Sequence, residues 1–499
     1  MVRPMVTGRS RVGSGWTRCG GAGLVLMVLA DMAACGSSPS EPGPAGAGGS
    51  DGSDGLAGSG GVRAEPGPPR GGGGSGLDFG DPGPGCGLAG CAPPPSSCPG
   101  GGQTSLSGTV YAPSGILPLY NVMVYVPSAP LEPLSSGATC ACEVSGEPVA
   151  AALTDTAGRF TLVNPPVGAN VPLVIQVGKW RRQFTVDTVS ACAENAVPDQ
   201  TLLLPSRQAE GDLPRIALTT GNADALECLI NKLGIDPSEF TPPDGAGRIN
   251  YFAGEGGTDR YVDDMNAGAD FPDAEELWSS VESLRRYDVV LLSCEGDKGY
   301  DDNKPDAAFE AMFEYTNLGG RVFASHWHQL WLQRGPEPFP EIADFVDEDD
   351  LNEVTADVVT SFPKGKALSE WLVNVDASSV PGRIDLTGTQ YTIEREAPEY
   401  AQRWIATSSP ETVQYLSANT PLGADPADQC GRVVLSDIHV TGSEDEGRDV
   451  SDDDLSFPEG CTTTDLSPQE KVLAYMLFDI SACVVPDSQP PAPPPIILR

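Results

Sequence analysis

Hydrophobic and polar positions alternate over short runs between residues 104 and 206. The runs at 122–126 and 171–177 are rich in β-branched and aromatic residues, and turn clusters such as 155–158 separate one run from the next. Regularly spaced short strands with Gly- and Pro-containing turns are typical of two packed antiparallel sheets. The pattern therefore predicts an antiparallel β-sandwich over residues 104–206.

A different pattern begins at residue 213 and continues to residue 484. Runs that are apolar throughout predict strands at 215–221, 248–254, 287–294, 321–326 and 431–439. Segments with one apolar face at a helical period predict helices at 224–233, 274–286, 307–318 and 469–480. Continuously apolar strands are expected in a parallel sheet that helices cover on both faces. The pattern therefore predicts a doubly wound, flavodoxin-like α/β domain over residues 213–484, with a long insertion at 329–430.

The two ends of the chain carry no core-forming pattern. Residues 1–34 combine several Arg with a short apolar run at 24–30, which is typical of a secretory signal and too short to span a bilayer. Residues 35–103 are rich in Gly, Pro and Ser, which predicts a disordered and flexible tether. Residues 485–499 are predicted to be a Pro-rich tail.

The predicted signal ends at a cysteine. The sequence Met32-Ala33-Ala34-Cys35 resembles the cleavage site of bacterial lipoproteins of the myxobacterial type. The resemblance implies that the Cys35 thiol is acylated and anchors the protein to a lipid bilayer. The alternative is an ordinary signal peptide that is cut near Ala34. An anchored protein is exported to the cell envelope; we expect the outer membrane, with the folded domains in the periplasm or at the cell surface.

The net charge excludes one class of partner. The chain has 69 acidic and 30 basic residues, which gives a formal charge of −39. A nucleic-acid binder needs a basic face to neutralise phosphates, so nucleic acid is excluded as a general partner. The same excess argues against electrostatic docking onto anionic lipid. The expected partners are therefore the bilayer, reached through Cys35, and an unidentified ligand or protein of the envelope.

The chain contains 13 cysteines. Cys19 lies in the predicted signal and Cys35 is the predicted lipid site, so eleven cysteines, an odd number, remain in the rest of the chain. An exported chain meets an oxidising compartment, where most cysteines pair, and an odd number leaves at least one thiol free or paired with another molecule. We expect the bridges to stay within sequence clusters, with Cys430, Cys461 and Cys483 holding the C-terminal region together.

Three motifs of residues 104–206 resemble the carboxypeptidase regulatory-like domain. They are G-T-V-Y at 108–111, L-T-D-T-A-G-R-F-T-L at 153–162 and P-P-V-G at 165–168. The resemblance implies a prealbumin-like sandwich. In that family the module is usually structural or adhesive and carries no catalytic residues.

Three motifs of the α/β region resemble the class I glutamine amidotransferase-like superfamily, and within it the ThuA-like group. They are D-V-V-L-L-S-C-E-G at 288–296, G-G-R-V-F-A-S-H at 319–326 and G-R-V-V-L-S-D-I-H at 431–439. The resemblance implies an amidotransferase-like fold with His326 and His439 at strand ends. Amidotransferases carry their nucleophilic cysteine in a G-x-C-x-G elbow, which this sequence lacks, because Cys294 lies at the end of the preceding strand. Glutaminase activity is therefore not expected.

All three histidines lie at or just after the carboxyl ends of predicted strands, where doubly wound sheets bind ligands. If the backbone stays extended, His326 and His328 project to the same side of the sheet. Because parallel strands end at one edge, we expect His326, His328 and His439 to converge within about 10 Å. The insertion at 329–430 leaves from this edge and is expected to cover the site.

Two kinds of chemistry fit these residues. His326, His328 and His439 together with Asp437 would suit a zinc or iron ion. His326 and His439, with Glu295 beside them, could instead supply a general acid and base. The alternative is that His326 and His328 hydrogen-bond loop carbonyls and organise the crevice without catalysis.

The sequence therefore leaves two functions open. The first is a cell-envelope lipoprotein that binds or displays something without catalysis. The second is a hydrolase, with a metal-dependent form included, that acts on carbohydrate or another envelope polymer through the histidine-lined crevice.

Overall fold

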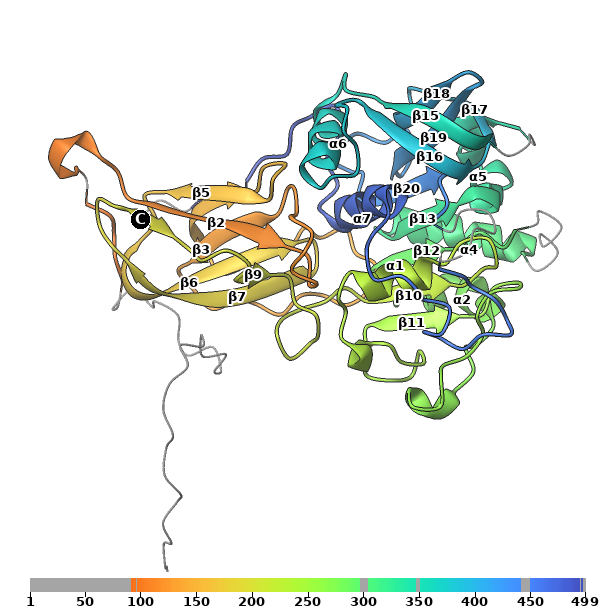
Figure 1. Ribbon diagram of the computed structural model, residues 1–499, viewed down its shortest axis with the longest axis horizontal. Helices are drawn as coiled ribbons and strands as arrows, with labels where there is room; N and C mark the ends of the chain where they lie inside the picture. The colour runs from red at the N-terminus through yellow and green to blue at the C-terminus, as the bar shows by residue number, and fades with distance from the viewer. Residues whose placement is uncertain are drawn as a thin grey trace, which may run out of the picture. The chain divides into compact units, whose positions relative to one another are not determined.

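The computed structural model describes residues 91–95, 97–296, 304–346, 351–440, 449–493 and 495–496. The predicted signal, Cys35 and the tether up to residue 90 lie outside these residues. Among the described residues, no helix is both long enough and apolar enough to cross a membrane. The described chain contains a β unit (residues 91–206) and an α/β unit (residues 213–487), which Figure 1 shows in orange to yellow and in green to blue.

The β unit contains two sheets. Its strands are β1 (Cys91–Ala92), β2 (Ser105–Tyr111), β3 (Met123–Pro127), β4 (Pro148–Leu153), β5 (Arg159–Val163), β6 (Val167–Val177), β7 (Trp180–Val189), β8 (Glu194–Ala196) and β9 (Leu202–Leu203). One sheet has the order β1-β6-β3-β4 with β7 beside β6, and the other has the order β5-β2-β8 with β9 beside β2. In β5 the side chains of Phe160 and Leu162 are buried and their neighbours are exposed, so the alternating pattern places one face of the strand on the core.

Two features of the β unit differ from the sequence prediction. The ordered part begins before residue 104, because β1 pairs with β6 and a disulfide joins Cys98 to Cys192. The end of the predicted tether therefore belongs to the β unit. In addition, β2 pairs in parallel with β8 and β9, so the sheets are not antiparallel throughout.

A parallel sheet forms the centre of the α/β unit. Its strands are β10 (Ile216–Thr219), β11 (Ile249–Phe252), β12 (Val289–Leu292), β13 (Arg321–Ser325) and β20 (Gly431–Ser436). They lie in the order β11-β10-β12-β13-β20, and every neighbouring pair is parallel. All of their residues except Arg321 are buried, which explains why each strand is apolar throughout in the sequence.

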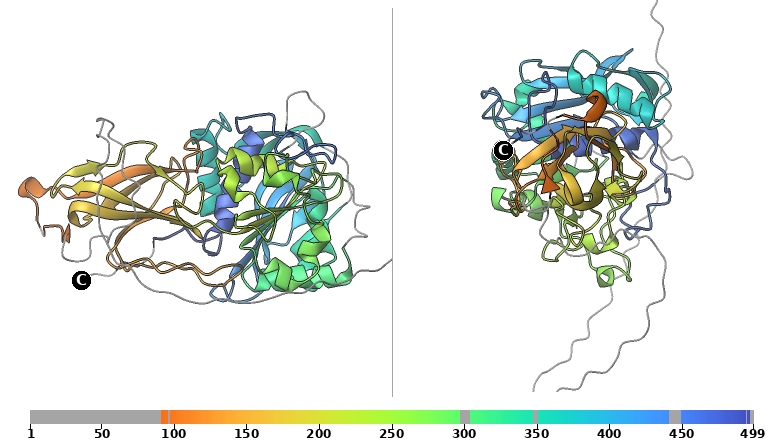
Figure 2. Two further views of the ribbon diagram at one scale, coloured as in Figure 1. Left: turned by 90° about the horizontal axis from the view of Figure 1, so that it is seen from below. Right: turned by 90° about the vertical axis from the view of Figure 1, so that its left-hand side faces the viewer.

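Helices cover both faces of this sheet (Figure 2, left). One face is covered by α1 (Leu226–Lys232), α6 (Pro363–Asn374) and α7 (Pro468–Ser481), and the other by α2 (Ala274–Trp278), α3 (Val281–Leu284), α4 (Asp306–Asn317) and α5 (Leu330–Gln333). Short 3-10 helices are η1 (Pro99–Gly101), η2 (Pro237–Glu239), η3 (Asn266–Gly268), η5 (His326–Gln329) and η6 (Phe339–Ile342). The single helix predicted at 274–286 is divided into α2 and α3, because the Ser280 side chain accepts a hydrogen bond from the Ser283 amide and starts a second helix.

The insertion widens the sheet. Its strands are β14 (Ala343–Phe345), β15 (Leu351–Val358), β16 (Arg383–Thr389), β17 (Ile393–Glu396), β18 (Ala401–Ser408) and β19 (Glu411–Thr420). Four of them continue the parallel sheet beyond β20 in the order β19-β18-β15-β16, with antiparallel pairing, to give nine strands in all. The expectation that the insertion covers the site is therefore wrong for these four strands, which extend the sheet sideways. Residues 389–392 do reach the end of β20, where Thr389 and Thr392 bond to Asp437.

The four disulfides whose two cysteines both lie among the described residues cross the sequence clusters, so the expected local pairing is wrong for them. The described bridges are Cys98–Cys192, Cys140–Cys430, Cys142–Cys483 and Cys228–Cys461, and Cys91 is also disulfide-bonded. Two of the bridges join the loop between β3 and β4 to the α/β unit. The free cysteine among the described residues is Cys294, in agreement with the odd cysteine count.

The two units also share a hydrophobic core. The ring of Tyr120 in the β unit stacks on Tyr475 of α7, with centroids 5.9 Å apart and planes at 7°. The indole N–H of Trp371, in α6, donates a hydrogen bond of 2.8 Å to the Pro118 carbonyl. Two disulfides, an aromatic contact and a shared core therefore join the β unit to the α/β unit.

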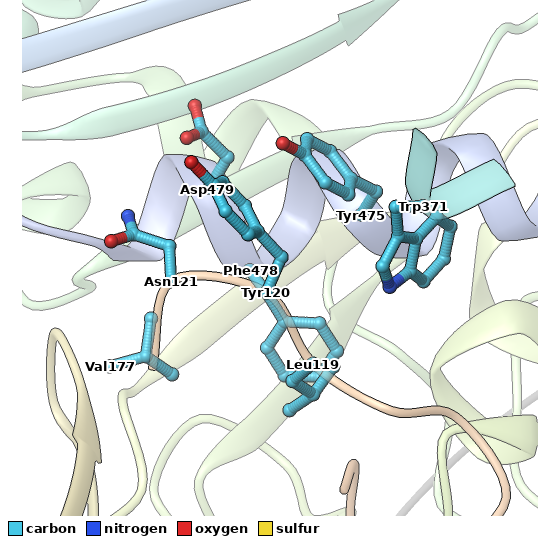
Figure 3. A pocket seen from close by; sticks show the side chains of 8 residues that line it. All are labelled: Leu119, Tyr120, Asn121, Val177, Trp371, Tyr475, Phe478 and Asp479. Carbon is cyan, nitrogen blue, oxygen red and sulfur yellow. The ribbon is translucent and has the colours of Figure 1, made fainter. Parts of the chain in front are cut away.

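A small pocket lies beside this contact (Figure 3). Its lining consists of Leu119, Tyr120, Asn121, Val177, Trp371, Tyr475, Phe478 and Asp479. The space open to water is about 10 Å³, which is room for roughly one water molecule. The pocket is a packing defect of the shared core and is too small for an organic ligand.

The start of the predicted Pro-rich tail belongs to the α/β unit. The Asp487 carboxylate is buried and accepts hydrogen bonds of 3.0 Å from the Arg432 guanidinium and from the Ser417 hydroxyl. Lys364 of α6 lies 3.4 Å from the same carboxylate. The tail is therefore fixed by buried ion pairs at least as far as Asp487.

We predict that Trp371→Ala lowers the free energy of unfolding by about 3–5 kcal/mol, because the side chain is fully buried between the two units. Trp371→Phe should cost less, since it keeps most of the packing and loses the hydrogen bond to Pro118. Chemical denaturation of the oxidised protein measures both. Equal stabilities of the wild type and the Ala variant would contradict a shared core.

Candidate functional site

Three neighbouring strands end together at the carboxyl edge of the parallel sheet. Cys294 follows β12, His326 follows β13 and His439 follows β20, and these strands are adjacent. The Sγ atom of Cys294 lies 3.3 Å from Nδ1 of His326, and the ring centroids of His326 and His439 are 5.1 Å apart. We call these three residues the Cys–His cluster. The structure thus brings two of the three predicted histidines together and adds the free cysteine.

The backbone of His326 adopts an unusual conformation. Its φ is 43°, in the left-handed region that non-glycine residues rarely occupy. The chain passes from β13 directly into η5 and α5 at this residue. A sharp strand-to-helix turn of this kind holds the nucleophile of α/β hydrolases at the edge of the sheet. In this chain the turn carries an imidazole at its tip.

Asp224 links the two strand ends that carry the histidines. Its Oδ2 accepts a hydrogen bond of 2.6 Å from the Ser325 hydroxyl, and its Oδ1 accepts one of 2.8 Å from the Val440 amide. Ser325 precedes His326 and Val440 follows His439, so one fully buried carboxylate fixes the backbone on either side of the cluster. The sequence pattern does not single out Asp224; its one signal is its position just after the first strand of the sheet.

His328 does not belong to the cluster. Residues 326–329 form a 3-10 turn, so the expectation that His326 and His328 project to the same side is wrong. The Nε2–H of His328 donates to the Ser293 carbonyl at 2.8 Å, and its Nδ1 accepts from the Trp331 indole N–H at 3.1 Å. These bonds define the neutral tautomer, and burial lowers the pKa of His328 to about 3.

The two predicted carboxylates have other partners. Asp437 accepts hydrogen bonds from the Thr392 amide at 2.8 Å and the Thr392 hydroxyl at 2.6 Å, and burial raises its pKa to about 6. It therefore ties the end of β20 to the insertion. Glu295 forms a buried ion pair of 2.7 Å with Lys304. Neither carboxylate is among the groups whose ligand atoms converge at the cluster.

Burial controls the protonation of the cluster. It raises the pKa of the Cys294 thiol to about 12 and lowers the pKa of His439 to about 4. It also lowers the pKa of His326 well below its usual value, and the neighbouring His439 and His328 add to that effect. At neutral pH the free protein therefore holds a thiol beside two neutral imidazoles, without the thiolate–imidazolium pair of a cysteine hydrolase.

Several buried polar atoms near this edge have no hydrogen-bond partner among the described residues. They include Nε2 of His326 and of His439, Oγ of Ser293, Oγ1 of Thr219 and both amide atoms of Gln329. Buried polar groups are almost always hydrogen-bonded to protein or to ordered water. The strand ends therefore offer a set of unused donors and acceptors to a small polar or ionic ligand.

The comparisons with known proteins give weak similarities only. No family model matches the chain, and no curated protein matches it. Among solved structures, a ThuA-like protein from Bacteroides uniformis is 10% identical, with 53% of this chain and 90% of that chain covered and a TM-score of 0.27. A protein described as part of a GMP synthase from Thermoplasma acidophilum is 9% identical, with 54% and 94% covered and a TM-score of 0.29.

We predict that acid destabilises the protein partly through His328. An unfolded histidine binds a proton near pH 6.5, whereas folded His328 does so only near pH 3, so its contribution to stability is present above pH 6.5 and is lost as the pH falls. Between pH 7.5 and pH 5 the loss from this one residue is about 2 kcal/mol.

Urea unfolding at the two pH values measures this loss. His328→Gln keeps a donor for Ser293 and an acceptor for Trp331 but does not titrate, so its stability should fall less over the same interval. An identical pH dependence in the wild type and the variant would contradict the assignment.

Proposed function

We propose that the protein is an extracytoplasmic binding protein of the bacterial cell envelope, held at the membrane by lipid on Cys35, and that it does not catalyse hydrolysis. The observation that carries the proposal is the burial of the Cys–His cluster. Cys294 is 0% exposed, and His326 and His439 are each 5% exposed. A polymer such as an envelope carbohydrate has no access to side chains buried to this extent.

The disulfides support a location outside the cytoplasm. The described bridges span sequence separations of 94 to 341 residues, and bonds of this kind persist in oxidising compartments. Two of them fasten the β unit to the α/β unit. We infer that the β unit, as a prealbumin-like sandwich, is a rigid spacer between the lipid-bearing N-terminal segment and the α/β unit.

The arrangement of charges argues against acid–base hydrolysis. A general base must lie within hydrogen-bond reach of the water or hydroxyl that it deprotonates. Glu295 is paired with Lys304 and Asp437 is bonded to Thr392, so neither is free for that role. The metal-dependent hydrolase remains the second candidate, because three side chains have converging ligand atoms and three is the number of protein ligands that a catalytic zinc site uses.

We predict that Cys35→Ser releases the protein from membranes, because the lipid on this residue is its proposed link to the bilayer. Fractionation of cells and incorporation of radiolabelled fatty acid measure the change. Cys19→Ser is the matched control. Residue 19 lies before the predicted cleavage site, so this variant should still carry lipid on Cys35. Fatty acid that still labels the Cys35→Ser variant would overturn the anchor.

We predict that iodoacetamide does not label Cys294 in the folded protein at pH 7 with a chelator present, because its Sγ is enclosed and held as a thiol. Labelling should appear on unfolding in urea, and Cys294→Ser identifies it by its loss. If the native protein were labelled rapidly and His326→Ala abolished that labelling, Cys294 would be a nucleophile activated by His326. The non-catalytic function would then be rejected.

A further inference from the structure

We propose that Cys294, His326 and His439 bind one borderline-soft transition metal ion, with Zn²⁺ as the ion that the site fits best. The inference goes beyond the envelope-binding function and does not depend on the lipid or on the absence of hydrolysis. It also replaces the ligand set expected from the sequence, since Cys294 takes the place of His328 and Asp437.

The geometry of the cluster suits a single ion. One ligand atom from each of the three side chains lies within 4.8 Å of the other two. In a tetrahedral zinc site with bonds of about 2.3 Å to sulfur and 2.0 Å to nitrogen, the sulfur and nitrogen ligands are roughly 3.5 Å apart. The Sγ atom of Cys294 and Nδ1 of His326 already lie at 3.3 Å.

The donor chemistry selects the class of metal. One thiolate and two imidazoles are typical ligands of zinc and copper, whereas magnesium and calcium take oxygen ligands. The backbone amides of Gly296 and Trp327 donate hydrogen bonds to Sγ of Cys294. Such bonds to a ligating sulfur stabilise the thiolate that a metal requires.

The surrounding structure holds the ligands in place before any ion binds. Each ligand follows a different strand of one sheet, and Asp224 fixes the backbone next to both histidines. The strained turn at His326 persists because the sheet and α5 determine the path of the chain on either side. Within the described part of the chain, Nε2 of His439 lacks a partner, in surroundings where an unused nitrogen is costly. Rigid elements and fixed neighbours are what a metal site needs to be selective.

The test uses the full mature chain without a polyhistidine tag, stripped with a chelator and then titrated with Co²⁺. A single Co²⁺ should bind with a sulfur-to-cobalt charge-transfer absorption, and one equivalent of Zn²⁺ should displace it. Cys294→Ser should abolish the absorption, and His326→Ala or His439→Ala should weaken binding by roughly 100-fold. Because Cu²⁺ binds more tightly than Zn²⁺ at almost any site with these ligands, affinity does not identify the resident ion. Metal analysis of the protein before it is stripped does so, and stoichiometric copper in place of zinc would replace zinc as the assigned ion.

Two control variants distinguish this site from cation binding elsewhere on the protein. His328→Gln should bind Co²⁺ as the wild type does, because His328 is bonded to Ser293 and Trp331. Asp453→Asn disturbs the exposed acidic group at 452–454, which can hold cations through oxygen alone and gives no thiolate absorption. Circular dichroism verifies that each variant is folded.

The proposal is overturned if the wild type takes up no stoichiometric metal, or if Cys294→Ser binds Co²⁺ with the wild-type spectrum. An equal loss of binding in His328→Gln would also reject the assigned ligand set. None of these results bears on membrane release by Cys35→Ser, so failure of the metal site and failure of the envelope function are distinguishable.

Discussion

β13 lies between β12 and β20 and pairs in parallel with both, so that Leu292 stands opposite Ala324, and Ser325 opposite Ser436. This register places the ends of the three strands within a few residues of one another. Adjacent strands are about 4.8 Å apart, so side chains at the ends of neighbouring strands can contact each other. A slip of the register would separate Cys294, His326 and His439, so the cluster depends on the sheet before it depends on any local contact.

The Cys–His cluster also requires that the ends of β13 and β20 stay in contact with each other and with the insertion. Buried polar contacts hold them there more than the apolar core does. Asp224 joins β13 to the end of β20, and Asp437 joins the same end to the insertion through Thr392. Removing one partner of such a contact leaves a buried carboxylate unsatisfied, which costs more than the bond itself contributes. The insertion and the segment before α1 are therefore coupled to the Cys–His cluster, although neither supplies a side chain to it.

The sequence predicts the parts of this structure that depend on local pattern. The five central strands are recognisable because each is buried on both faces and therefore apolar throughout, and β5 is recognisable because its side chains alternate. The break at Ser280 and the turn at His326 are not visible in the periodicity, since one capping hydroxyl and one positive φ decide them. The disulfides and the role of Asp224 depend on which distant segments meet. Spacing along the chain carries no information about that, as the bridge from Cys142 to Cys483 illustrates.

The burial of the cluster decides which kinds of ligand are compatible with it. A large substrate must reach the reacting groups of its enzyme, and here the thiol and both imidazoles are covered by the chain that holds them. A small cation needs no opening beyond its own passage, and it gains from enclosure because electrostatic attraction is stronger where water is excluded. The proposed lack of hydrolysis and the proposed metal site therefore rest on the same features of the α/β unit, which are an enclosed thiol, carboxylates bonded elsewhere and a rigid sheet edge.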